Sequence, residues 1–126
     1  MSKMSQNNIQ KPKEHQGYVM FDLDGTLAEY TSWKGEAHIG PPIPTMIQRL
    51  LKYLAEGYEV RIFTARAINP SAVPHIERWC EENIGCILPV TNQKDYDMIR
   101  LYDDRAVSVE HNTGKCFSFD TYPHTT

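Results

Sequence analysis

Apolar residues along this chain fall into short runs separated by polar, glycine-rich and proline-rich segments. The run at 18–21 is apolar, favours β-structure and ends abruptly at Asp22. Comparable runs occupy 60–63, 87–90 and 99–102, and 116–119 is a candidate last strand. Short runs that end at polar residues are typical of buried parallel strands. In the second run, Glu59 and Arg61 alternate with apolar residues, which predicts that one face of that strand is partly solvated.

Two segments between these runs have the apolar spacing of amphipathic helices. The first begins at Pro44, which suits a first helical turn, and ends near Gly57, which suits a C-cap. The second lies within 71–83, and Gly85 can end it. The apolar positions are Met46, Ile47, Leu50, Leu51 and Leu54 in the first and Val73, Ile76, Trp79 and Cys80 in the second.

The alternation of strands and helices predicts an α/β fold with a central parallel sheet. Right-handed crossovers place helices over such a sheet, so we expect the three layers of a Rossmann-like fold with both faces covered. A chain of 126 residues has room for one domain, which we place at 17–126 after a flexible, polar arm at 1–16. The segment 28–44 is rich in glycine and proline and is predicted to be a long loop.

Composition narrows the classes of partner. The chain has a formal net charge of −3, which gives no general attraction for nucleic acid or for anionic membranes. It has no apolar run long enough to span a membrane, and 1–16 lacks the apolar stretch of a secretory signal. We therefore expect a cytoplasmic protein, and homo-oligomerisation stays open.

Polar residues follow the predicted strands at the edge where an α/β sheet binds ligands. Asp22, Thr64 and Asp103 each come directly after an apolar run, and Lys94 follows the third run by a few residues. Ligands of open parallel sheets bind beyond the carboxyl ends of the strands. The sequence thus predicts a site that brings these residues together.

These residue types suit the hydrolysis of phosphate esters. Asp22 can attack phosphorus as a nucleophile, and Asp24 can protonate the leaving group and then activate water. The negative charges of nucleophile and substrate require a cation, and Asp22 and Asp103 offer the oxygen ligands that Mg²⁺ prefers. Thr64 and Lys94 can hold the remaining phosphoryl oxygens.

The order of these residues resembles the four motifs of phosphatases of the haloacid dehalogenase superfamily. Asp22-Leu23-Asp24-Gly25-Thr26 is similar to the first motif, Thr64 to the second, Lys94 to the third, and Asp103-Asp104 to the fourth in its double-aspartate form. The resemblance implies an aspartyl-phosphate on Asp22. It also implies Mg²⁺ held by Asp22, the backbone carbonyl of Asp24 and Asp103, with Asp104 assisting. Which of the paired aspartates binds the metal directly stays open.

The resemblance also implies that this protein lacks a cap domain, because neither interval between motifs is long enough for one. Substrate choice then falls to the loop, where Tyr30, Trp33, Lys34 and His38 can contact the leaving group. Arg66 lies in Phe63-Thr64-Ala65-Arg66, which is similar to the phosphatase part of phage polynucleotide kinase-phosphatases, and it is a candidate phosphate ligand. Small phosphorylated molecules and phosphorylated polymer ends, including nucleotide or polynucleotide 3′-phosphates, stay open as substrates.

Two other classes of function use similar residues. A phosphoacceptor module of the response-regulator receiver type also combines aspartates, Mg²⁺, Thr and Lys, but its acidic pair comes first in the chain. A catalytically silent binding protein is the other class, since one fold hosts many functions. The order of the motifs and the presence of Asp24 favour hydrolysis, although phosphoryl transfer by a mutase uses the same residues.

Overall fold

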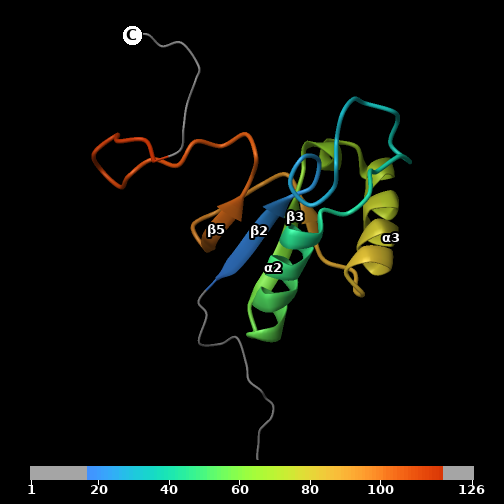
Figure 1. The fold of residues 1–126 in the computed structure, drawn as a ribbon, viewed down its shortest axis with the longest axis horizontal. Helices are drawn as coiled ribbons and strands as arrows, with labels where there is room; N and C mark the ends of the chain where they lie inside the picture. Colours follow the sequence, from blue (N-terminus) through green and yellow to red (C-terminus); the bar gives the residue numbers. More distant parts are fainter. Residues whose placement is uncertain (1–16, 118–126) are drawn as a thin grey trace, which may run out of the picture.

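Four parallel strands form one sheet in the order β4-β3-β2-β5, so that β2 and β3 occupy its centre (Figure 1). The computed structural model describes residues 17–117; the predicted arm at 1–16 and the end of the last predicted strand, 118–119, lie outside them. Along the described residues the elements are β2 (Tyr18–Asp22), α2 (Pro44–Ala55), β3 (Glu59–Phe63), the 3₁₀ turns η2 (Ala65–Ile68) and η3 (Pro70–Ala72), α3 (Val73–Asn83), β4 (Val90–Thr91) and β5 (Met98–Tyr102).

The register of the sheet places the carboxyl ends of its four described strands at one edge. Asp22 pairs with Phe63 of β3, Phe21 pairs with Tyr102 of β5, and Phe63 pairs with Thr91 of β4. Residues that directly follow these strands therefore lie at the same carboxyl edge. This edge carries the predicted site.

Helix α2 has the bounds that its sequence signals predict. Pro44 occupies the first turn, where its missing N–H removes no intrahelical hydrogen bond. Gly57 adopts a φ of +91°, and its N–H donates to the carbonyl of Leu54 at 3.0 Å. Glycine tolerates this left-handed conformation without a steric penalty, which explains why the helix ends there.

Two elements differ from their predicted bounds. Helix α3 begins at a later residue than its apolar pattern predicts, and strand β4 is shorter and begins at a later residue. Residues 70–72 form the 3₁₀ turn η3, and the helix starts at Val73, because Pro74 fits only in a first helical turn. The strand expected at 87–90 comprises Val90–Thr91 alone. Pro89 has no N–H to donate to a ladder, although its carbonyl accepts from Ile62 N at 2.8 Å.

Both helices contribute buried apolar residues to one cluster with one face of the sheet, although Leu51 of α2, predicted for the apolar face, is 40% exposed. The cluster includes Val19, Phe21, Val60 and Ile62 from the strands and Ile47, Leu50, Ile76, Trp79 and Cys80 from the helices. Tyr18, Met20 and Arg61 alternate with these strand residues and stand outside the cluster, and the Arg61 guanidinium lies 3.6 Å from the centre of the Tyr18 ring. The prediction that one face of β3 is partly solvated is therefore confirmed. Within 17–117, both helices cover the opposite face of the sheet, the one that carries Val60 and Ile62.

The α/β class and the all-parallel sheet are confirmed, and the architecture is compatible with a Rossmann-like fold. Both described helices pack on the same face, so the helical cover expected on the second face is not found among residues 17–117, where no helix connects β4 with β5. Between β2 and β3 the described chain holds only a loop and α2, and between β3 and β4 only η2, η3 and α3, so no cap domain occurs within 17–117. No helix among these residues is long and apolar enough to cross a membrane.

The segment after β5 folds back on itself rather than adding a strand to the sheet. Val109 and Cys116 form an isolated antiparallel bridge, and Phe117 N donates to Ser108 O at 2.8 Å. The strand predicted at 116–119 is therefore, as far as the described residues reach, half of this small hairpin. Its partner is local because the chain turns at 111–113.

The loop at 29–42 is fixed at its base. Ala28 forms an antiparallel bridge with Pro42, and Glu29 N donates to Pro41 O at 2.9 Å. The carbonyl of Gly40 accepts from the indole Nε1 of Trp79 at 2.9 Å, which joins the loop to α3. The loop therefore leaves and rejoins the domain at one place, above the carboxyl ends of the strands (Figure 1).

Substitution Gly40→Ala should loosen this base. A Cβ atom there would lie 2.1 Å from the backbone oxygen of Glu29, and backbone atoms can move only by distorting the loop. We expect a loss of about 1–3 kcal/mol in the free energy of unfolding, measured by urea denaturation. Ser32→Ala, at an exposed position of the same loop, should leave the midpoint unchanged. Equal midpoints for Gly40→Ala and wild type would contradict the close approach.

Candidate active site

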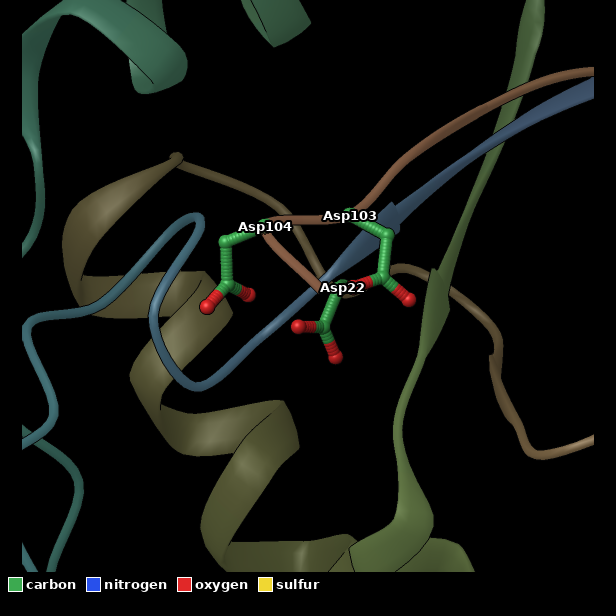
Figure 2. A group of neighbouring side chains, drawn as sticks. All are labelled: Asp22, Asp103 and Asp104. Carbon is green, nitrogen blue, oxygen red and sulfur yellow. The ribbon is translucent and has the colours of Figure 1, made fainter. Parts of the chain in front are cut away.

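Three carboxylates meet at the carboxyl edge of the sheet. Asp22 is the last residue of β2, and Asp103 and Asp104 directly follow β5, the neighbouring strand. One oxygen from each lies within 4.8 Å of the others. Figure 2 shows the three side chains leaving these two strand ends toward a common space. The structure therefore brings together residues that are about 80 positions apart in sequence, as parallel pairing of β2 with β5 requires.

The crowding of negative charge changes the acidity of Asp22. Burial is the main cause that raises its pKa to about 7, and a hydrogen bond to Asp104 and the charges of Asp103 and Asp104 act in the same direction. The backbone N–H of Leu23 opposes the shift. A cation bound among these carboxylates would relieve the repulsion and favour the ionised form.

Thr26 and Gly25 position Asp104. The buried Thr26 hydroxyl donates to Asp104 Oδ1 at 3.0 Å and accepts from Asp104 N at 3.0 Å. Gly25 has a φ of +89°, and a Cβ atom there would lie 2.6 Å from Asp104 Oδ2. The glycine thus serves two needs, the turn after β2 and room for the carboxylate. Asp103 is oriented separately, by the N–H of Arg105 at 2.8 Å from its Oδ1.

Arg66 pairs with Asp24 and holds the loop. Its Nε and Nη2 donate to the two oxygens of Asp24 at 2.8 and 2.9 Å, a bidentate geometry. Its guanidinium also donates to the carbonyls of Glu36 at 3.2 Å and His38 at 3.0 Å. The Arg66 side chain is 5% exposed and that of Asp24 is 22% exposed. Arg66 thereby connects the ends of β2 and β3 with the loop.

Thr64 is buried and starts the turn that presents Arg66. Its hydroxyl oxygen accepts from Arg66 N at 3.2 Å, which caps η2. The structure therefore gives Thr64 the turn-capping role that a strand-end threonine commonly has, and it also places Thr64 on the wall of the site cavity. The two roles are compatible, because the hydroxyl hydrogen stays available for a ligand oxygen.

A cavity of about 550 Å³ joins these residues with the loop. Its walls include Asp22, Asp24, Thr64, Arg66, Asp103 and Asp104 of the predicted site, Tyr30 and Trp33 of the predicted substrate loop, and Phe63, Ala65, Asn69 and Arg105. Lys34 and His38 line a separate, smaller cavity of about 280 Å³ that shares Tyr30 and Arg66. Of the four predicted loop residues, Tyr30 and Trp33 therefore line the cavity that contains the carboxylates. Lys34 and His38 line only the smaller one.

Lys94, the predicted phosphate ligand, also does not line the cavity of about 550 Å³. It is exposed, on the segment that connects β4 with β5. The next residue, Asp95, accepts a hydrogen bond from the Tyr18 hydroxyl at 2.9 Å, and Tyr18 N donates to the carbonyl of Asp97 at 3.0 Å. Because Tyr18 begins β2, the segment has already turned back from the carboxyl edge. The phosphate-binding role of Lys94 stays a prediction.

The residues present fit a divalent cation of the Mg²⁺ type. All three clustered side chains offer carboxylate oxygens, the donors that Mg²⁺ prefers, and one oxygen of each lies within 4.8 Å of the others. Asp24 stands apart from the cluster, since its carboxylate pairs with Arg66. The ligand role predicted for its backbone carbonyl stays a prediction.

Besides the apolar Phe63 and Ala65, two polar residues that line the cavity were not assigned to the site by the sequence. Asn69 lies between η2 and η3, and Arg105 follows the paired aspartates. For Arg105 the sequence holds a local signal of a place at the site, because a basic residue there directly follows two acidic ones. For Asn69 the sequence holds no such signal, because the folding of η2 and η3 beside the carboxyl edge brings it to the cavity.

Removing the hydroxyl of Thr26 should disturb Asp104 and destabilise the protein. Thr26→Val keeps the shape of the side chain but loses both hydrogen bonds to Asp104, and we expect a loss of about 1–3 kcal/mol in the free energy of unfolding. Thr26→Ser keeps the hydroxyl and serves as the matched control. Urea denaturation measures both. A valine variant as stable as the serine variant would show that these bonds contribute nothing.

In metal-free protein, the acidity of Asp22 should make stability depend on pH. Its pKa is raised to about 7 in the folded state, so ionisation destabilises the folded state as pH rises from about 4 through 7. Asp104→Asn removes part of the cause and should narrow the difference in unfolding free energy between pH 5 and pH 8. Urea denaturation in a chelator measures this difference, with Asp97→Asn as control. An equal or larger difference in Asp104→Asn would refute the coupling.

Comparison with known proteins gives a likeness of fold. No protein-family model and no curated protein matches the chain. A solved structure described as "Structure of the conserved protein coded by locus from Bacteroides thetaiotaomicron" is similar with a TM-score of 0.55 at 19% sequence identity. The match covers 71% of this chain and 76% of that chain. At this identity the likeness concerns the fold alone, and it supports the α/β architecture of the domain.

Proposed function

We propose that this protein is a Mg²⁺-dependent phosphohydrolase that removes phosphate from a monoester through an aspartyl-phosphate on Asp22. The observation that supports the proposal most directly is the meeting of Asp22, Asp103 and Asp104 in one cavity with Asp24 and Thr64. The order of motifs that resembles the haloacid dehalogenase superfamily agrees with it. Hydrolysis of a phosphate monoester needs a nucleophile, a proton donor and charge neutralisation, and this cavity has a residue for each.

Asp22 is the group that attacks phosphorus in this proposal. Its position at the end of the central strand β2 gives it a rigid support and leaves its carboxylate partly exposed to the cavity. Mg²⁺ bound by Asp22, Asp103 and Asp104 would supply neutralising charge for nucleophile and phosphoryl group. Attack forms an Asp22–phosphorus bond and breaks the bond from phosphorus to the ester oxygen; hydrolysis then returns free Asp22 and inorganic phosphate.

Asp24 supplies and removes the protons. In the first step it passes to the leaving oxygen a proton that it has taken up from solvent, and in the second it takes a proton from the attacking water. The bidentate contact with Arg66 fixes the direction of its carboxylate, and each oxygen keeps a second lone pair for the substrate. Arg66 is therefore foremost a positioning residue for Asp24. Thr64 can donate its hydroxyl hydrogen to a phosphoryl oxygen.

The test is release of inorganic phosphate from a panel of phosphate monoesters in the presence of Mg²⁺. Asp22→Asn should lower kcat on the order of 10³-fold or more, because it removes the nucleophile. Asp24→Asn should lower it about 10²–10⁴-fold, because it removes the acid and base. Asp97→Asn, an acid outside the cavity lining, is the control and should retain full activity. Chelation of the metal should abolish release in wild type.

Three results would reject this mechanism. Unchanged phosphate release by Asp22→Asn would exclude Asp22 as the nucleophile. Absence of hydrolysis in wild type, together with a phosphoryl group that stays on Asp22 in mass spectra, would assign a phosphoacceptor switch instead. Absence of both hydrolysis and adduct would assign a binding role.

A further inference from the structure

We propose that the substrate of this site is a nucleoside monophosphate, whose base stacks on Trp33 and Tyr30 at the mouth of the cavity. The inference rests on the proposed phosphohydrolase and adds to it the chemical class of the leaving group. It follows from the exposure of two aromatic rings, from the way one of them is held, and from the charges of the cavity walls.

The two aromatic side chains are exposed where they line the cavity. Trp33 is 56% exposed and Tyr30 is 47% exposed, and both share the cavity with Asp22. The other tryptophan of the chain, Trp79, is 6% exposed and belongs to the hydrophobic core. Large aromatic surface is normally buried, and its presentation at a cavity with charged residues is typical of sites that stack planar ligands.

Trp33 is held in place before any ligand arrives. The Arg66 guanidinium lies 4.8 Å from the centre of the Trp33 ring, and this guanidinium is itself fixed by its bonds to Asp24 and the carbonyls of Glu36 and His38. Ser71 adds a hydrogen bond to the Glu36 carboxylate at 2.9 Å. A preorganised ring loses little conformational freedom on binding, which strengthens stacking.

The position of Trp33 separates the aromatic part of the substrate from its phosphate. Trp33 contacts Arg66, and Arg66 contacts Asp24, so the indole lies one side chain beyond the proton donor. A ring that carried the phosphate directly, as in an aryl phosphate, would sit beside Asp24. A ring attached through a sugar would reach Trp33. A cavity of about 550 Å³ lies within the range of about 300–1,000 Å³ that holds ligands of this size.

The charges of the walls favour a leaving group that carries no further phosphate. Four carboxylates and two guanidinium groups line the cavity, which leaves a formal excess of two negative charges. One divalent cation balances this excess, and the transferred phosphoryl group brings its own negative charge. Arg66 is already paired with Asp24. A second phosphate, or the backbone of a polynucleotide, would meet little positive charge here.

Steady-state kinetics with Mg²⁺ tests the proposal on wild-type protein. The substrates are nucleoside 5′- and 3′-monophosphates, ribose 5-phosphate, a nucleoside diphosphate, phosphotyrosine and a 3′-phosphorylated oligonucleotide. We expect kcat/KM for a nucleoside monophosphate to exceed that for ribose 5-phosphate about tenfold or more, through stacking of the base. Trp33→Ala should raise KM for the nucleotide by a similar factor and change kcat/KM for ribose 5-phosphate much less. Trp33→Phe should keep most of the preference.

A matched control separates stacking from a general effect of losing an aromatic residue. Tyr96 is fully exposed on the segment between β4 and β5 and does not line the cavity. Tyr96→Ala should therefore leave the kinetics of every substrate unchanged. Tyr30→Ala should raise KM for the nucleotide selectively. Circular dichroism confirms that the variants are folded.

A binding measurement tests the inference independently of turnover. Because Trp33 is exposed and Trp79 is buried, a base that stacks on Trp33 should quench the tryptophan fluorescence of Asp22→Asn. Ribose 5-phosphate should not quench it, and a Trp33→Phe substitution in the same background should remove the effect. Quenching without hydrolysis by wild type would support the base-binding surface and reject the phosphohydrolase.

Other outcomes would overturn the proposed nucleotide preference without contradicting the proposed phosphohydrolase activity. These are equal kcat/KM for the nucleotide and ribose 5-phosphate, equal loss of both in Trp33→Ala, or a preference for phosphotyrosine. A preference for the oligonucleotide over the mononucleotide would assign the site to polymer ends instead. Absence of phosphate release from every substrate would reject the proposed function itself.

Discussion

The contact between Arg66 and Asp24 connects the three parts of the chain that make the candidate site. Asp24 follows the central strand β2, Arg66 follows β3, and the same guanidinium holds two carbonyls of the loop at 29–42. A charge-assisted bidentate pair is strong, and this one is largely buried, so breaking it would leave a charge without a partner. The orientation of Asp24, the path of the loop and the position of Trp33 all depend on it.

The carboxylates at the sheet edge differ from the paired Asp24. Among the described residues, their negative charges lie beside one another. Burial is the main cause that raises the pKa of Asp22 to about 7, and the nearby charges of Asp103 and Asp104 act in the same direction. Thr26 and Gly25 nevertheless keep Asp104 there, one by hydrogen bonds and the other by leaving space. A fold that holds like charges together with such specific support stores unfavourable energy that a bound cation can release. This is the physical reason to connect the cluster with Mg²⁺.

The loop at 29–42 lies above the candidate site, where a larger protein could have a cap domain. It leaves and rejoins the domain beside Ala28 and Pro42, and Arg66 holds its middle, so a short segment presents Tyr30 and Trp33 at the cavity. An open site excludes water less completely than a closed one, and rigid aromatic surface is one way to gain binding without closure. The proposed nucleotide preference follows from this geometry.

Much of this arrangement follows from the sequence alone, because its signals are local. Apolar runs ending in Asp22, Thr64 and Asp103 specify parallel strands whose carboxyl ends share an edge, and Pro44 and Gly57 delimit α2 by backbone sterics. Local patterns could not predict that the segment carrying Lys94 turns back toward the start of β2. Nor could they predict that Arg66 pairs with Asp24, or that Trp33 and not Lys34 faces the carboxylates. Those outcomes depend on contacts between residues far apart in the chain, which only the packed tertiary structure brings within hydrogen-bonding distance.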